Sequence, residues 1–205
     1  MRLIWGMALA AMACTASATA QDRPAALAAP ATTDGARDFD FEFGDWDAHI
    51  ARRLHPLTGS EEWAVYDGDS VVHKVWGGDA NLGELDVKGP AGRIHGLSLR
   101  LYDPAAKKWR IHWSNSNDGQ IGPAMVGGFS GGRGEFYDAE MLGARSIYVR
   151  FIFTGATAGT TKFRIEQAFS ADGGKTWETN WIADFRKRSE DSTFPSLQGR
   201  GSRGG

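Results

Sequence analysis

The sequence predicts an all-β protein, an up-and-down antiparallel barrel of about ten strands. Short runs rich in β-branched and aromatic residues follow one another from about residue 39 to residue 188. Gly, Asn, Asp and Pro separate these runs at intervals of roughly ten residues, a spacing typical of sandwiches and barrels. No long run has the period of a helix, and closing the sheet into a barrel leaves no exposed edge strand.

The first twenty residues have the pattern of a cleavable secretory signal peptide. Arg2 supplies the positive charge, residues 3–13 are apolar, and Ala18-Thr19-Ala20 has the small residues of a cleavage site. The apolar run is much shorter than the roughly 20 residues that a membrane-spanning helix needs. We therefore predict cleavage before Gln21, export to the periplasm or out of the cell, and no integral membrane span.

The one cysteine of the chain, Cys14, lies inside this leader. Acylation of Cys14 would instead anchor the protein to lipid, and this is the alternative to cleavage before Gln21. Cleavage removes the cysteine, so the mature chain would have no disulfide, no thiol nucleophile and no Cys-based metal site.

Three segments follow the leader. Residues 21–38 are rich in Ala, Pro and Thr without periodicity and predict a flexible linker. Residues 39–188 are long enough for one β-barrel domain, and the polar, Gly- and Ser-rich residues 189–205 predict a disordered tail. The net charge is −2, or −3 once Arg2 is lost, and no basic stripe occurs. This charge pattern excludes nucleic acid as the expected partner.

Eleven short strands are expected between turn signals such as Asp67-Gly68 and Gly89-Pro90. Gly, Asn and Asp are typical of tight hairpins because they tolerate positive φ. A short turn is expected near residues 36–41. The expected strands are residues 41–53, 61–67, 70–76, 81–87, 93–102, 108–115, 123–129, 133–138, 145–153, 162–169 and 177–187.

Alternation along these strands predicts which side chains face the interior. In the last two strands the inward residues are Phe163, Ile165, Gln167, Phe169, Trp177, Thr179, Trp181, Ala183 and Phe185. In the strands 93–102 and 108–115 the inward residues are His95, Leu97, Leu99, Leu101, Trp109, Ile111 and Trp113, with Arg100, Arg110 and His112 outside. If the last two strands pair through their apolar faces, Glu166 lies opposite Asn180 on the outer face and forms a polar ladder there with Arg150.

Two motifs carry structural information. Gly44-Asp45-Trp46 stands at the start of the first strand and resembles the Gly-x-Trp signature of lipocalin-type barrels, where the Trp plugs one end. Residues 170–177 (SADGGKTW) match the Asp-box, in which Ser and Asp side chains bond to the backbone of a hairpin turn. A single clear copy in a short chain does not make a propeller, so this motif predicts a stapled hairpin and not a glycosidase.

The longer stretches LRLYDPAAKKWRIHWSNSNDGQIGP and IEQAFSADGGKTWETNW resemble a group of uncharacterised exported bacterial lipocalin-like proteins. The resemblance runs from about Phe39 to Lys187 and is most specific in the second stretch. It implies a calycin-type barrel with an internal cavity. It implies no established activity, so no catalytic residue follows from it.

The residues themselves predict no metal site and no cofactor. The five histidines are spread over separate strands without the spacing of a ligand cluster, and single satisfied histidines are the expected state. A haem would need one inward histidine, for which His73 and His95 are the candidates. No nucleotide-binding loop or nucleophile motif occurs, so the catalytic residues, if there are any, are unknown.

Three hypotheses follow. In the first, an aromatic-lined barrel binds a small apolar or aromatic molecule outside the cytoplasm. In the second, a cofactor-free isomerase, hydratase or lyase uses the same cavity, with His95, His73 and Gln167 as its first polar candidates. In the third, the protein has no cavity and acts through its surface at the cell envelope. The candidate ligand-binding residues are Trp46, Trp63, His73, His95, Trp113, Gln167 and Trp181.

Overall fold

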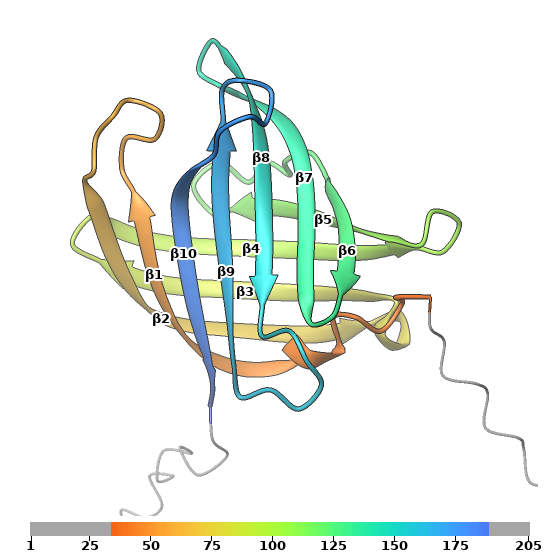
Figure 1. Cartoon of the computed structure of the whole chain (residues 1–205). Coiled ribbons are helices and arrows are strands. Elements are labelled where there is room, and N and C mark those ends of the chain that lie inside the picture. Colours follow the sequence, from red (N-terminus) through yellow and green to blue (C-terminus); the bar gives the residue numbers. More distant parts are fainter. Residues whose placement is uncertain (1–33, 189–205) are drawn as a thin grey trace, which may run out of the picture. The chain divides into compact units, whose positions relative to one another are not determined.

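A computed structural model describes residues 34–188, which form a closed barrel of ten antiparallel strands (Figure 1). Each strand pairs with its neighbours in the sequence, and β1 closes the barrel against β10. The predicted up-and-down barrel is therefore confirmed. The predicted leader with Cys14, most of the linker and the predicted tail lie outside the described residues.

The strands are 6 to 13 residues long, joined mostly by short hairpins. They are β1 (Gly44–Arg53), β2 (Trp63–Val75), β3 (Ala80–Gly89), β4 (Gly92–Asp103), β5 (Lys108–Asn115), β6 (Met125–Ser130), β7 (Arg133–Leu142), β8 (Arg145–Thr154), β9 (Lys162–Ser170) and β10 (Glu178–Lys187). Two 3₁₀ turns, η1 (Asp40–Glu42) and η2 (Trp76–Gly78), complete the elements. Within residues 34–188 no helix is long and apolar enough to cross a membrane.

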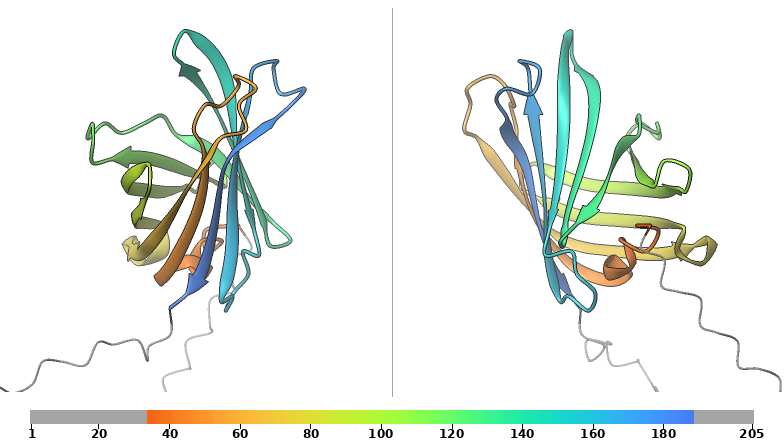
Figure 2. Two further views of the ribbon diagram at one scale, coloured as in Figure 1. Left: turned by 90° about the vertical axis from the view of Figure 1, so that its left-hand side faces the viewer. Right: turned by 45° about the vertical axis from the view of Figure 1, so that its right-hand side comes forward.

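The strands of the two sides of the barrel cross steeply. Figure 2 shows β7 to β10 on one side and β2 to β4 on the other, running in clearly different directions. Such tilt is required when a sheet closes on itself. The two sides thus present two separate inner walls, which together position the candidate site.

The predicted break between residues 61–67 and 70–76 is wrong. Asp67 and Gly68 lie inside the single strand β2, where Gly68 pairs with Ala48 and Val87. A Cβ at Gly68 would lie 2.1 Å from the backbone oxygen of Asp86. The glycine therefore allows a close approach of two strands and does not mark a turn.

The predicted phase of β4 is also wrong. Gly96, Ser98 and Arg100 are buried and inward, whereas His95 is exposed and the leucines at 97, 99 and 101 are half-buried. Trp113 of β5 does face the interior, and a Cβ at Gly96 would lie 2.0 Å from its ring. The inward Trp113 therefore requires glycine on the neighbouring strand. The inward Arg100 is accepted because it has a buried acidic partner, Glu42.

A bulge in β10 overturns two further expectations. The register shifts between Thr179 and Trp181, so Trp181 pairs with Gln167 and Ile182 pairs with Glu166. Glu166 is therefore not opposite Asn180, and the predicted ladder with Arg150 does not form. Trp177 does not share the inner face of the barrel with Trp181. It lies outside, with the Arg150 guanidinium 4.5 Å from its ring centre. One extra residue in a strand reverses the face of every residue beyond it.

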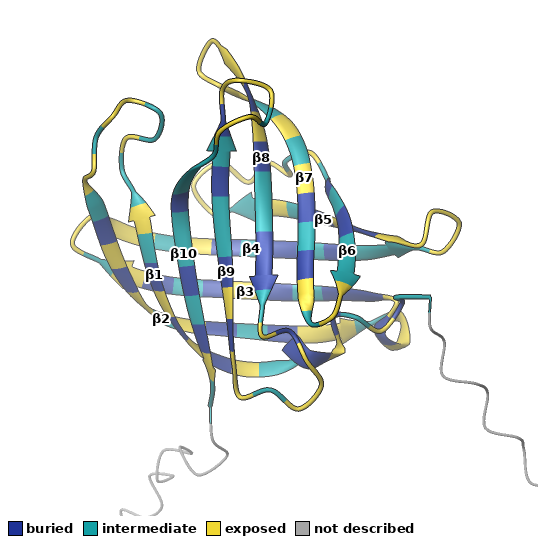
Figure 3. Ribbon diagram, in the orientation of Figure 1, coloured by how far each residue is buried: buried dark blue, intermediate teal, exposed yellow. Residues whose placement is uncertain are grey.

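One end of the barrel is filled by aromatic rings, and Figure 3 shows the buried positions. Phe39 sits at its centre, with ring centres of Phe129, Trp109 and Phe153 between 4.8 and 5.5 Å away. These are edge-to-face contacts, the favoured geometry for aromatic pairs. The backbone oxygen of Gly35 accepts from Trp109 at 2.8 Å, so the end of the predicted linker packs against the barrel.

Trp46 belongs to this closed end. It is fully buried, and its indole N–H donates to the backbone oxygen of Glu42 at 2.7 Å. The ammonium of Lys187 lies 4.5 Å from the Trp46 ring and also donates to the backbone oxygen of Phe43. These contacts join the first strand, the last strand and η1.

The Asp-box forms the hairpin between β9 and β10, as the sequence predicts. Asp172 accepts hydrogen bonds from the backbone N–H of Lys175 at 3.0 Å and from that of Thr176 at 2.9 Å. The Ser170 hydroxyl accepts from the backbone N–H of Gly174 at 2.8 Å, and the Trp177 indole donates to the oxygen of Gly174 at 3.0 Å. The motif is structural here.

Candidate functional site: a cavity inside the barrel

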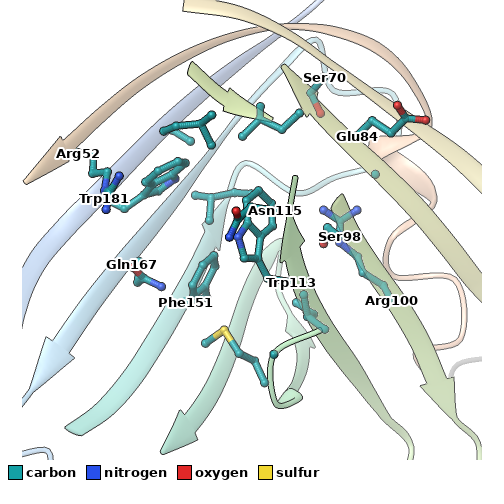
Figure 4. A pocket seen from close by; sticks show the side chains of 18 of the residues that line it. Arg52, Ser70, Glu84, Ser98, Arg100, Trp113, Asn115, Phe151, Gln167 and Trp181 are labelled. Carbon is teal, nitrogen blue, oxygen red and sulfur yellow. The ribbon is translucent and has the colours of Figure 1, made fainter. Parts of the chain in front are cut away.

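A cavity of about 540 Å³ lies inside the barrel and is bordered on one side by Glu42, Phe153 and Phe185 of the aromatic end. Its lining comes from opposite walls, with Leu85 of β3 and Ser98 of β4 on one side and Phe151 of β8 and Ile165 of β9 on the other. Figure 4 shows these walls converging on a common space. The volume falls in the range of pockets that hold small organic molecules, roughly 300–1,000 Å³.

One wall of the cavity is largely apolar and includes one amide, Gln167 of β9. It is built by inward residues of β5, β6, β8, β9 and β10. The side chains are Ile111, Met125, Phe151, Phe153, Ile165, Trp181, Ala183 and Phe185. Methionine adapts to apolar ligands of different shape and aromatic rings offer a large contact area, so this wall can take a hydrophobic body.

The opposite wall carries a buried polar group. Arg100 is 5% exposed and pairs with the equally buried Glu42 of η1. Its Nη2 donates to Oε1 of Glu42 at 3.0 Å, and its Nη1 lies 2.8 Å from Oε2. Nη1 also donates to the side-chain oxygen of Asn81 at 3.0 Å. Ser70 and Ser98 line the cavity on the same wall, and Figure 4 shows Ser98 beside Arg100.

The environment of this ion pair is largely apolar. The guanidinium lies 4.9 Å from the centre of the Phe39 ring, on the aromatic end of the barrel. Burial raises the pKa of the Glu42 carboxyl, and the charge of Arg100 opposes this rise. Three buried atoms of this cluster make no hydrogen bond: Nε of Arg100, Nδ2 of Asn81, and Oε2 of Glu42, which contacts Arg100 only as an ion pair. Unpaired buried polar atoms cost free energy.

A second acidic group lies on β7. Glu140 lines the cavity. Burial raises the pKa of its carboxyl, and the negative charge of the nearby Asp138 raises it further. One carboxylate oxygen of Asp138 is buried without a hydrogen-bond partner. Among the lining residues that are not exposed, the acidic Glu42 and Glu140 stand against the single basic Arg100, while Arg52, Arg93 and Glu84 are exposed.

The cavity opens at the barrel end where its exposed lining residues Arg52, His95 and Trp113 lie. At this end β5 and β6 diverge, since they share only three register pairs, the last between Ile111 and Met125. Beyond them the Trp113 side chain is 41% exposed. The chain then turns back through residues 116–124, and the backbone N–H of Gly122 donates to the backbone oxygen of Trp113 at 2.8 Å. The oxygen of Gly122 is 3.1 Å from Nδ1 of His112. This loop and the Trp113 ring form the rim of the opening.

The structure places the seven predicted site residues in three groups. Trp113, Gln167 and Trp181 line the cavity, and His95 borders it from an exposed position. Trp46 lies in the closed end, away from the cavity lining. The other two are outside the lumen. Trp63 lies under the Arg53 guanidinium, and His73 is exposed.

Sequence reasoning missed Glu42, Ser98 and Arg100. Glu42 precedes the first strand, so no strand pattern includes it. Arg100 is predicted to lie outside because the neighbouring leucines are more hydrophobic, and Ser98, two residues away, shares its face. The available signal was Gly96, which shares their face and provides the space that the neighbouring Trp113 requires.

The geometry gives no support to a catalytic histidine. His49 lies 2.6 Å from Asp67, and both side chains are more than half exposed on the outside of the barrel. Among residues 34–188 no three His, Cys, Asp or Glu side chains gather as metal ligands do. The inward histidine that a haem would need is not found at His73 or His95, because both are exposed.

No family model matches the sequence, and no curated protein is significantly similar to it.

Proposed function

We propose that this protein is an exported, lipocalin-like binding protein that takes up a small apolar or aromatic molecule in its barrel. The observation that carries the proposal is the cavity of about 540 Å³ between a largely apolar wall and a polar wall, with Trp113 at its opening. A barrel acting only through its surface has no need of such a space, and well-packed interiors leave few voids larger than a water molecule.

Binding can be tested with the uncharged fluorophore N-phenyl-1-naphthylamine. We expect its fluorescence to rise on mixing and to saturate at one molecule per chain. Ala183 is buried in the cavity wall, so Ala183→Phe should fill the site and weaken binding at least tenfold. Ala139→Phe on the exposed outer side of β7 is the matched control. Equal binding by both variants, with both folded by circular dichroism, would contradict the proposal.

The export part of the proposal rests on the leader and has its own test. The full chain expressed in a Gram-negative host should be recovered from the periplasmic fraction with a mass that begins at Gln21. A mass that retains residues 1–20 in the cytoplasm would reject export, and a lipid-modified N-terminus at Cys14 would favour the anchored alternative.

A further inference from the structure

The cavity has two chemically different walls, and this difference specifies the ligand further. We infer that the ligand is an uncharged molecule with an apolar or aromatic body and one hydrogen-bond-accepting oxygen, such as a ketone or ester carbonyl, which docks against Ser98 and Arg100. This inference rests on the proposed function.

The first step is the placement of the donors. Ser98 and Arg100 lie two residues apart on the inner face of β4, and both line the cavity. Gly83 of β3 pairs with Ser98, and a Cβ there would lie 3.5 Å from Nη1 of Arg100. The missing side chain leaves the guanidinium uncovered on this side. A hydroxyl and a guanidinium both donate, and the guanidinium cannot accept.

The second step is the cost of this arrangement. Taking an arginine and a glutamate out of water is expensive, and apolar residues of similar volume often serve stability as well. Arg100 nevertheless lines the cavity beside Ser98. A ligand oxygen that accepts from this wall would add a hydrogen bond to groups that folding has already taken out of water.

The net charge of this wall limits the charge of the ligand. Glu42 already neutralises Arg100 at 2.8 Å, so the wall offers donors without net positive charge. A ligand carboxylate would add an anion to an interior that also holds Glu140 and Asp138. A ligand ammonium cannot accept from Ser98 or Arg100 and would pair with Glu140 instead, so tight binding of an ammonium would contradict docking at Ser98 and Arg100. A neutral carbonyl accepts without adding charge, and the largely apolar wall from Met125 to Phe185 receives the rest of the molecule.

Four matched compounds test the inference by displacement of N-phenyl-1-naphthylamine. They share a phenylalkyl body: 4-phenyl-2-butanone, butylbenzene, 4-phenylbutanoate and 4-phenylbutylammonium. At pH 8 we expect the ketone to bind severalfold tighter than butylbenzene although it is better solvated by water. We expect the two ions to bind at least tenfold more weakly than the ketone. Tighter binding of either ion would overturn the inference.

Two variants locate the contact. Ser98→Ala should weaken the ketone about fivefold and leave butylbenzene unchanged, whereas Ser114→Ala on the outer side of β5 should change neither. Glu42→Gln keeps an acceptor for Arg100 but removes the neutralising charge, so 4-phenylbutanoate should gain about tenfold. Unchanged affinities in both variants, with the probe still bound, would reject this contact alone. Failure of the probe and all four compounds to bind would reject the proposed function itself.

Discussion

At the scale of single residues, the interior is organised by a few groups that break its hydrophobic pattern. Arg100 and Glu42 are buried as a pair, and Gly96 is small because Trp113 covers it. Neither fact follows from hydropathy, since a strand written Gly-Leu-Ser-Leu-Arg-Leu favours burial of its leucines. The partner that reverses this preference, Glu42, is 58 residues away in the sequence.

Glu140 gives a prediction at this scale. Burial and the neighbouring Asp138 raise the pKa of its carboxyl above the ordinary 4.5. The folded state then holds the proton more tightly than the unfolded state, so ionisation at Glu140 lowers stability as pH rises above about 4.5. Glu140→Gln should therefore raise the melting temperature at pH 8 and change it little at pH 4. Glu61→Gln on the exposed β1–β2 loop is the control. A smaller gain at pH 8 than at pH 4 would show that the sign is wrong.

At the scale of elements, the hairpin between β9 and β10 is a self-contained unit. Thr176 donates its hydroxyl to Asp172 at 2.6 Å, in addition to the backbone hydrogen bonds that this carboxylate accepts. These hydrogen bonds hold the pKa of Asp172 well below its usual range.

Asp172→Asn tests the staple and its pH dependence. A lowered pKa contributes stability that is present above the unfolded value of 3.8 and is lost as pH falls below it. The variant should thus melt at a lower temperature than the wild type at pH 7, and the difference should shrink between pH 4 and pH 2. Asp118→Asn, in the exposed β5–β6 loop, provides the comparison. A difference that grows on acidification would contradict this account.

The sequence predicted elements better than it predicted faces. Hairpin punctuation located nearly every strand, because Gly and Asn/Asp at turns act locally. Gly68 led to a false prediction of a turn, because glycine here allows a close contact between strands. The β10 bulge and the phase of β4 depend on pairing with other strands. Of the predicted site, Trp113, Gln167 and Trp181 reach the cavity lining, whereas Trp63 and His73 do not.

At the scale of the whole molecule, the interior of the barrel has a packed aromatic end and a cavity. The aromatic rings around Phe39, together with Trp46, close one end, and the cavity opens toward the other end, where Trp113 and His95 lie. A cavity in an otherwise close-packed protein is the feature that a binding function explains.

The central claim is that a small apolar molecule binds inside this barrel, and nuclear Overhauser effects test it most directly. The protein would be labelled at isoleucine, valine and methionine methyl groups and saturated with 4-phenyl-2-butanone. We predict contacts from the phenyl protons to Ile111, Met125 and Ile165 in the cavity, and none to Val65 or Ile121, which are exposed. Contacts confined to these exposed methyl groups, or no contacts at saturation, would contradict the claim.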